Sequence, residues 1–361
     1  MDFSLHFDIP HGLTYLNTPG NGLMPTTHYQ WRQQREKDFF APEGKLRDEQ
    51  VSFIEGVKET VAQTFHCLSN QVYCTANFSV GYNTLLNGLA KDLTFLLIDE
   101  DYPSLNFPVI SRGFKHHFIP QGENLEAQIL EGIKKHKAQV LVLSVINYIT
   151  GLKIDLSFIR TLKELHPDLL IIGDATQYLG TAPFDFSTSG FDAIGCSGYK
   201  WLMAGFGNGI ILLSEQLKEQ LYKEAKERQR PKEAMWQHKS ILDTYFEPGH
   251  QDCSAHGTLQ QSLLFLQKLE LTKIEQHIAG LTQQAYAALE ERNLLLPIAA
   301  ARPIQSALIN IQIDQSLYPL LLTEGIRCFP RGTGIRIGLH LYNTEQDIEK
   351  LIHLIDKHAK K

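Results

Sequence analysis

The sequence predicts an α/β protein with a large, mainly parallel sheet that is covered by helices on both faces. Between residues 70 and 216, continuous apolar segments such as AQVLVLSVIN alternate with amphipathic segments such as LEAQILEGIKKHK. Strands that are apolar along their whole length are typical of parallel sheets with helical connections, because both faces are buried. The alternation stops after about residue 216, and we expect a smaller α+β domain beyond it.

The elements of the large domain are expected in the following order. Residues 27–66 are expected to be helical, because apolar side chains from Phe53 to Phe65 recur at four-residue steps. A strand in QVYCTAN and a helix in SVGYNTLLNGLAKDL come next. Further strands are expected in LTFLLIDEDYP, SRGFKHHFIP, AQVLVLSVIN, DLLIIGDATQ, FDAIGCSG and GIILLSE, with helices in LEAQILEGIKKHK and DLSFIRTLKELHP.

The last third of the chain follows a different pattern. Residues 216–239 are charged, contain a proline and lack strand signals, which indicates a domain boundary or a flap over an active site. A long helix over 262–292, strands in SALINIQI and IRIGLHL and a final helix are expected beyond it. We therefore expect an N-terminal arm over 1–20 that joins the small domain, a large domain over 21–230 and a small domain over 231–361.

Composition limits the class of protein. The chain has 361 residues and a formal net charge of −6, with basic residues spread along it, which argues against nucleic acid or an anionic membrane as partner. Its five cysteines form no CxxC pair, and this favours a reducing compartment. The N-terminal residues do not resemble a signal peptide, and no apolar segment is as long as a membrane span. A cytoplasmic location is the resulting expectation.

One lysine lies in an unusual context. Lys200 is the only charged residue in GCSGYKWLMAGFGNG, a glycine-rich turn between two apolar strands. A lysine in a semi-apolar pocket loses its proton readily and becomes a nucleophile for a carbonyl. Asp174 ends the strand DLLIIGD, Gln177 follows it, and ligands of open α/β sheets bind at such strand ends. Pyridoxal phosphate is the expected carbonyl compound, because it needs an amine, an acid for its ring nitrogen and a phosphate site.

A phosphate site is available where NFSVGYN leads into a helix. The free N–H groups and the dipole at a helix N-terminus favour an anion. Ser79 adds a hydroxyl, and Ser197 and Tyr199, just before the lysine, add two more. Ser79 is equally suited to a plain helix cap.

These segments resemble the class V aminotransferase family of fold-type I pyridoxal-phosphate enzymes, which includes cysteine desulfurases, kynureninases and isopenicillin-N-epimerase-like proteins. GDATQYLG followed by SGYK is similar to the family's Asp-x-x-Gln and Ser-Gly-His-Lys pattern. YLNTPGNGLMP, DYPS, INYITGLKIDL, FEPG and IRIGLHLYNTEQDIEKLI resemble further family segments in the same order. The resemblance covers most of the chain, and it implies a seven-stranded sheet and a homodimer with active sites at the interface.

The resemblance implies roles for the cofactor-binding residues. Lys200 would form a Schiff base with pyridoxal phosphate and later act as general acid and base. Asp174 would pair with the ring nitrogen, and Gln177 would donate a hydrogen bond to the phenolic oxygen. Tyr102 would stack on the ring, with Phe107 as the alternative. The phosphate would be bound by Ser79, the amide of Val80, Ser197 and Tyr199.

The substrate side and the reaction are less constrained. Arg336 would bind the substrate carboxylate, and Asn147 either contacts the substrate or closes a turn. Tyr199 replaces the family's usual histidine, and Cys328 lies in an apolar context unlike that of a desulfurase nucleophile. Arg331 is a candidate second anion-binding residue, and no histidine spacing resembles a zinc site. We expect an aminotransferase, with a kynureninase-type or desulfurase-type lyase as alternative and a non-catalytic binding protein as a third option.

Overall fold

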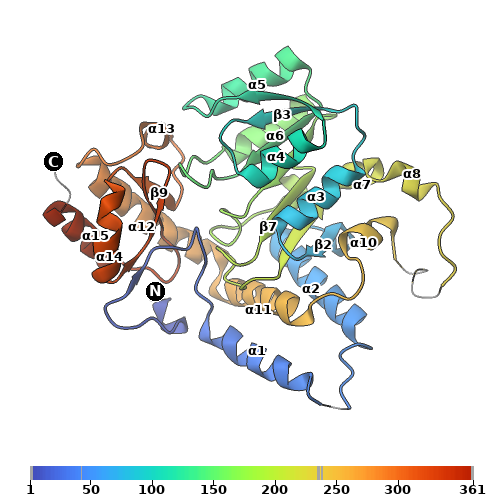
Figure 1. Cartoon of the computed structure of the whole chain (residues 1–361), viewed down its shortest axis with the longest axis horizontal. Coiled ribbons are helices and arrows are strands. Elements are labelled where there is room, and N and C mark those ends of the chain that lie inside the picture. The colour runs from blue at the N-terminus through green and yellow to red at the C-terminus, as the bar shows by residue number, and fades with distance from the viewer. Residues whose placement is uncertain (1–2, 42, 234–235, 237–238, 359–361) are drawn as a thin grey trace.

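A seven-stranded sheet forms the centre of the computed structural model, which describes residues 3–41, 43–233, 236 and 239–358 (Figure 1). The strand order is β2-β8-β7-β6-β5-β3-β4, and β8 alone runs antiparallel to its neighbours β2 and β7. The strands are β2 (Val72–Thr75), β3 (Thr94–Ile98), β4 (Lys115–Ile119), β5 (Val140–Ser144), β6 (Leu170–Asp174), β7 (Ala193–Ser197) and β8 (Gly209–Leu213).

Helices cover both faces of this sheet, as the continuous apolar strands predict. Along β3, Phe95 and Leu97 belong to one hydrophobic core, whereas Leu96 belongs to the other. Successive side chains of a strand point to opposite faces, so a strand needs apolar residues throughout to fill both cores. The helices of the large sheet are α2 (Gln50–Phe65), α3 (Phe78–Gly88), α4 (Pro103–Ser111), α5 (Leu125–His136), α6 (Leu156–Leu165), α7 (Glu215–Gln220), α8 (Lys223–Lys226) and α10 (Ile241–Phe246).

The C-terminal third forms a second, smaller sheet. Its order is β11-β12-β9, with both pairs antiparallel. The N-terminal arm reaches this region, because β1 (Thr14–Tyr15) pairs in parallel with β10 (Ile326–Arg327). The domain limits given above remain a prediction. The other elements are β9 (Leu308–Ile311), β11 (Phe329–Arg331), β12 (Gly334–Gly338), α11 (Cys253–Leu269), α12 (Leu271–Glu290), α13 (Pro297–Ala300), α14 (Tyr318–Thr323) and α15 (Glu345–His358).

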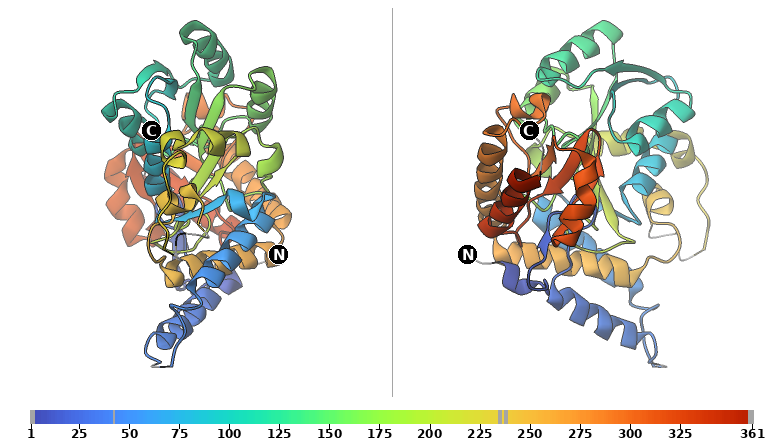
Figure 2. Two further views of the ribbon diagram at one scale, coloured as in Figure 1. Left: turned by 90° about the vertical axis from the view of Figure 1, so that its right-hand side faces the viewer. Right: turned by 60° about the vertical axis from the view of Figure 1, so that its left-hand side comes forward.

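Two expected helices differ from the structure, and one observed helix was not expected. The helix predicted over 27–66 is two helices, α1 (Thr26–Asp38) and α2, because Pro42 and Gly44 disfavour helix between them. Figure 2 shows α1 projecting from the body of the molecule. The long helix predicted over 262–292 is divided into α11 and α12 at Glu270, whose φ is 65°. Helix α4 was not expected, because the apolar segment around Pro108 shows no helical periodicity.

Residues 1–2, 234–235 and 237–238 lie outside the described part of the chain, so the arm and the charged segment over 216–239 are described only in part. No helix of the described residues is both long enough and apolar enough to span a bilayer.

Candidate active site

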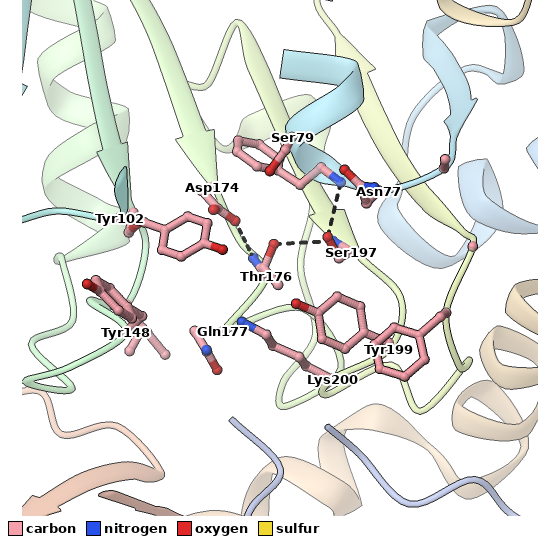
Figure 3. Close-up of a pocket in the computed structure, with 16 residues that line it drawn as sticks. Asn77, Ser79, Tyr102, Tyr148, Asp174, Thr176, Gln177, Ser197, Tyr199 and Lys200 are labelled. Atoms are coloured by element: carbon pink, nitrogen blue, oxygen red, sulfur yellow. Dashed lines mark hydrogen bonds between the residues drawn. The ribbon is translucent and has the colours of Figure 1, made fainter. Parts of the chain in front are cut away.

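A cavity of about 480 Å³ opens at the carboxyl ends of the parallel strands. Strands β5, β6 and β7 end there in Ser144, Asp174 and Ser197, and α3 begins on one side of it. Figure 3 shows how the side chains around the opening converge from separate elements. The lining residues are Ala76, Asn77, Phe78, Ser79, Tyr102, Ser144, Ile146, Tyr148, Asp174, Thr176, Gln177, Ser197, Tyr199, Lys200, Phe206 and Gly207.

Lys200 projects into this cavity from the turn between β7 and β8. Its amine lies 5.5 Å from the ring centroid of Tyr199 and 6.0 Å from that of Tyr102. The pKa of the amine is lowered to about 8, chiefly by burial; Asp174 opposes the shift, and Arg336 and Arg331 add to it. About a tenth of the amine is therefore uncharged at pH 7, far more than for an exposed lysine, and this favours a nucleophilic role.

Asp174 supplies a buried carboxylate to the same cavity. Only 6% of its surface is exposed, and its Oδ1 accepts a hydrogen bond of 2.8 Å from the Thr176 amide. Burial raises the pKa of the carboxyl to about 6, although the Thr176 hydrogen bonds and Lys200 oppose the shift. Such a group binds tightly to a cationic or proton-bearing partner that enters the cavity, because the partner restores the solvation that burial removes.

The N-terminus of α3 forms one wall of the cavity. Asn77 caps the helix, and its Oδ1 accepts a hydrogen bond of 3.0 Å from the Val80 amide. The Ser197 hydroxyl accepts a hydrogen bond of 3.0 Å from the Phe78 amide and keeps its own hydrogen for another acceptor. The Val80 amide, expected to bind phosphate, is thus already engaged, and the Val80 side chain does not line the cavity. Ser79 and Ser197 do line it and suit an anion.

Aromatic rings enclose the remainder of the cavity. Tyr102 and Tyr148 meet edge to face with ring centroids 5.1 Å apart, and Tyr199 stacks on Phe206 at 4.8 Å. Phe107, the alternative stacking residue, is 67% exposed and does not line the cavity. Of the two expected candidates, Tyr102 is therefore the one placed beside the lysine.

Tyr102 is fixed by a carboxylate that the sequence interpretation did not single out. Buried Asp101 accepts hydrogen bonds from the Tyr102 amide at 2.7 Å and from the Ser144 amide and hydroxyl at 2.8 and 2.6 Å. The carboxylate thereby joins the start of α4 to the end of β5. Its position in the acidic segment DEDYPS was the available sequence signal.

Gln177 lines the cavity with its amide held from behind. Its Oε1 accepts a hydrogen bond of 2.6 Å from the Trp201 indole, and its Nε2 donates one of 3.0 Å to the Pro19 carbonyl. Pro19 belongs to the N-terminal arm, and Gly22, just after the arm, donates a hydrogen bond of 2.9 Å to the Tyr199 carbonyl. The segment over 19–22 therefore contacts both Gln177 and the turn that carries Lys200.

Arg336 and Asn147 are not among the residues that line the cavity. Arg336 is buried on β12 and donates a hydrogen bond of 2.6 Å to the Tyr148 carbonyl. Burial lowers the pKa of its guanidinium to about 10, and neighbouring Arg331 adds to the shift. Asn147 closes a turn, because its Oδ1 accepts hydrogen bonds from the amides of Ile149 and Thr150, and it does not line the cavity.

The cysteines lie elsewhere. None of them lines the cavity in the described structure, and burial raises the pKa of the Cys328 thiol to about 12. The described residues also contain no group of three or more potential metal ligands.

The residues around the cavity fit pyridoxal phosphate. Lys200 offers an amine of lowered pKa, Asp174 a buried acid, and the N-terminus of α3 with Ser79 and Ser197 an anion site. Tyr102 offers an aromatic face, and the cavity of about 480 Å³ lies within the range typical of sites for small molecules.

Comparison with known proteins agrees with this fit. The sequence model of the family "Aminotransferase class-V" matches residues 43–351. An uncharacterized aminotransferase of Bacillus subtilis, YcbU, is 23% identical over an alignment of 279 residues that covers 72% of this chain and 71% of YcbU.

Solved structures share the fold. A cysteine desulfurase from Thermococcus onnurineus in its apo form has a TM-score of 0.82 at 14% identity, covering 96% of this chain and 94% of its own. The cystine C–S lyase C-DES, in complex with its product cysteine persulfide, has a TM-score of 0.83 at 19% identity, covering 96% and 98%. These similarities confirm the predicted α/β fold of type I with its seven-stranded sheet. The family match over most of its length shows that the chain belongs to the class V aminotransferase family, whose cofactor is pyridoxal phosphate.

Proposed function

We propose that this protein is an aminotransferase that binds pyridoxal phosphate through Lys200 and moves an amino group from an amino acid to a 2-oxo acid. The observation that carries the proposal is the shared cavity of Lys200 and Asp174, an amine of lowered pKa and a buried acid of raised pKa. The description of YcbU as an aminotransferase also supports it. When bound, the cofactor supplies an aldehyde that condenses with amines and a ring that withdraws electrons.

Lys200 would have two tasks. It would hold the cofactor in the resting protein, and after release it would move the proton at the substrate Cα as general base and acid. A pKa of about 8 suits both tasks, because the amine accepts and returns a proton near neutral pH.

The other residues would bind and orient. Asp174 would pair with the cofactor's ring nitrogen, Ser79 and Ser197 would hold its phosphate, and Tyr102 would cover its ring. Arg336 would bind the substrate carboxylate, because its unpaired Nε and its other guanidinium donors suit a bidentate contact.

A desulfurase that uses a cysteine nucleophile of its own is a weaker alternative. Such chemistry needs an accessible thiol close to the substrate, and the described cavity is lined by none. A lyase that needs no protein thiol would use the same Lys200 and Asp174. It is therefore distinguished from an aminotransferase by the products of the reaction and not by these residues.

Single-turnover absorption measurements test the proposal. The protein loaded with pyridoxal phosphate is mixed with individual amino acids in the absence of any 2-oxo acid. An aminotransferase converts the bound cofactor once to its pyridoxamine form and releases one equivalent of 2-oxo acid. A lyase releases product over many turnovers while the original absorption returns.

Two variants complete the design. Lys200→Ala should lose the conversion, whereas Lys273→Ala, a control at a 47% exposed lysine of α12, should retain it. Absence of conversion in the parent with every amino acid would contradict the proposed reaction.

We further propose a cytoplasmic homodimer. Large apolar side chains on and near α1 and α2 support a second copy on this side, because such side chains gain from burial. They are Tyr29, Phe39, Phe40 and Val51, which are 57–86% exposed. Light scattering coupled to gel filtration tests it, and a monomer at micromolar concentration would contradict it.

A further inference from the structure

The Gln177 amide is fixed in a single orientation by two neighbours of opposite hydrogen-bonding type. The Trp201 indole is only a donor and gives its hydrogen to Oε1 at 2.6 Å. The Pro19 carbonyl is only an acceptor and takes a hydrogen from Nε2 at 3.0 Å. Exchanging the amide oxygen and nitrogen would break both bonds. Both side chains are buried, with Gln177 4% and Trp201 1% exposed.

Trp201 is itself held rigidly. Its carbonyl accepts a hydrogen bond of 3.0 Å from the ring of buried His340, and the two rings meet edge to face at 5.2 Å. Gly180 lies so close that a Cβ there would be 2.4 Å from the Trp201 carbonyl oxygen. The indole therefore has little freedom to follow a rotating amide.

The remaining hydrogen of Gln177 Nε2 is the donor that the fixed orientation leaves for another acceptor, and Gln177 lines the cavity that contains Lys200. We propose that Trp201 is a positioning residue that makes Gln177 a donor toward an anionic ring oxygen of the cofactor. The inference rests on the proposed function, because the acceptor belongs to pyridoxal phosphate. With the amide reversed, its carbonyl oxygen would face that anionic oxygen and repel it.

The first experiment measures the bond without the cofactor. The free energies of unfolding are determined for the apoprotein, Trp201→Phe, Gln177→Leu and the double variant. Trp201→Phe keeps one aromatic ring but removes the indole N–H together with part of the buried ring. The comparison of the two backgrounds separates the lost hydrogen bond from this packing loss, because the packing loss occurs in both. We expect it to lower the unfolding midpoint clearly in the parent but by less than half as much in the Gln177→Leu background. An equal loss of stability in the parent and in the Gln177→Leu background would show that the hydrogen bond between Trp201 and Gln177 does not stabilise the protein.

The second experiment measures the consequence for the cofactor. Trp201→Phe should weaken pyridoxal phosphate binding roughly tenfold and shift the pH midpoint of the cofactor's visible absorption band. In the Gln177→Leu background the same substitution should change the dissociation constant by less than about twofold. Trp31→Phe, the same substitution in α1, should leave both quantities unchanged.

The outcomes separate the two proposals. Equal loss of affinity in both backgrounds would show that Trp201 acts only through the packing of its turn, which overturns the positioning role. If the parent binds no pyridoxal phosphate while the apoprotein shows coupling, the proposed function fails and the role toward the cofactor fails with it. A parent that binds the cofactor and an unchanged Trp201→Phe variant would overturn this inference alone.

Discussion

Replacement of Gly22 by alanine should displace the segment over 19–22 from the turn that carries Lys200. A Cβ at residue 22 would lie 2.0 Å from the Lys200 carbonyl oxygen, 3.1 Å from its carbonyl carbon and 3.3 Å from Met203 Cγ. Two of these three atoms are backbone, so no side-chain rotation relieves the overlap. Restoring normal contact requires a shift of about 1 Å, which is enough to break the 2.9 Å hydrogen bond from the Gly22 amide to Tyr199.

The magnitude follows from these contacts. Overpacking of a buried site costs about 1–3 kcal/mol, and the lost hydrogen bond adds about 1 kcal/mol. We therefore expect Gly22→Ala to lower the free energy of unfolding by about 2–4 kcal/mol and to weaken pyridoxal phosphate binding, because Lys200 moves with its turn. Urea denaturation and cofactor titration measure the two effects.

A matched control is Gly280→Ala on α12, where a Cβ meets no atom within 4 Å. Alanine favours a helix interior over glycine, so this variant should be more stable by about 0.5–1 kcal/mol. If Gly22→Ala matched its parent in both stability and cofactor affinity, the contact between Gly22 and the Lys200 turn would not have the role assigned to it.

Three further results are expected. Asp174→Asn should raise the dissociation constant of pyridoxal phosphate at least tenfold, and an unchanged titration would leave Asp174 only a turn-forming role. Arg336→Lys should raise KM for the amino acid more than it lowers kcat, because lysine cannot make two parallel hydrogen bonds to a carboxylate. An unchanged KM would show that Arg336 does not bind the substrate carboxylate. Burial lowers the pKa of His28 in the folded protein to about 4. As the pH falls, the histidine is therefore protonated in the unfolded chain before it is protonated in the folded protein. Stability should fall as pH drops from 6.5 toward 4, by about 3 kcal/mol from this residue. Urea denaturation of His28→Gln should show a correspondingly weaker pH dependence.

The sequence predicted most of the large domain because its signals are local. Apart from the edge strand β4, whose sequence KHHFI is largely polar and exposed, each strand of the central sheet is a short apolar segment, so both its place and its two-sided burial follow from neighbouring residues. The break between α11 and α12 was not predictable in this way. Glu270 adopts a positive φ without any glycine or proline to signal it, so packing against the rest of the molecule decides the break.

The same distinction applies to the candidate site. Lys200, Asp174, Gln177, Ser197 and Tyr102 were identified from motifs, and the structure brings all five to one cavity. The contacts that orient them were not foreseeable, since they join distant parts of the chain, as the bond between Gln177 and Pro19 does across 158 positions.

Two groups that were expected to contact ligands make local hydrogen bonds in the structure, and their contacts with a ligand stay predictions. The Val80 amide donates to the Asn77 cap, and Asn147 closes its own turn. Asparagine side chains commonly satisfy nearby backbone groups, so their position near a site does not by itself indicate contact with a ligand.

The central claim is that Lys200 is the residue that holds pyridoxal phosphate, and chemical trapping tests it most directly. The protein is incubated with the cofactor, reduced with borohydride and digested, and the modified peptide is located by mass spectrometry. We expect one equivalent of label on Lys200. Lys153 is the informative competitor, because it is also partly buried with a pKa lowered by burial but lies outside the cavity. Label on Lys153 or on surface lysines instead of Lys200 would show that Lys200 does not hold the cofactor.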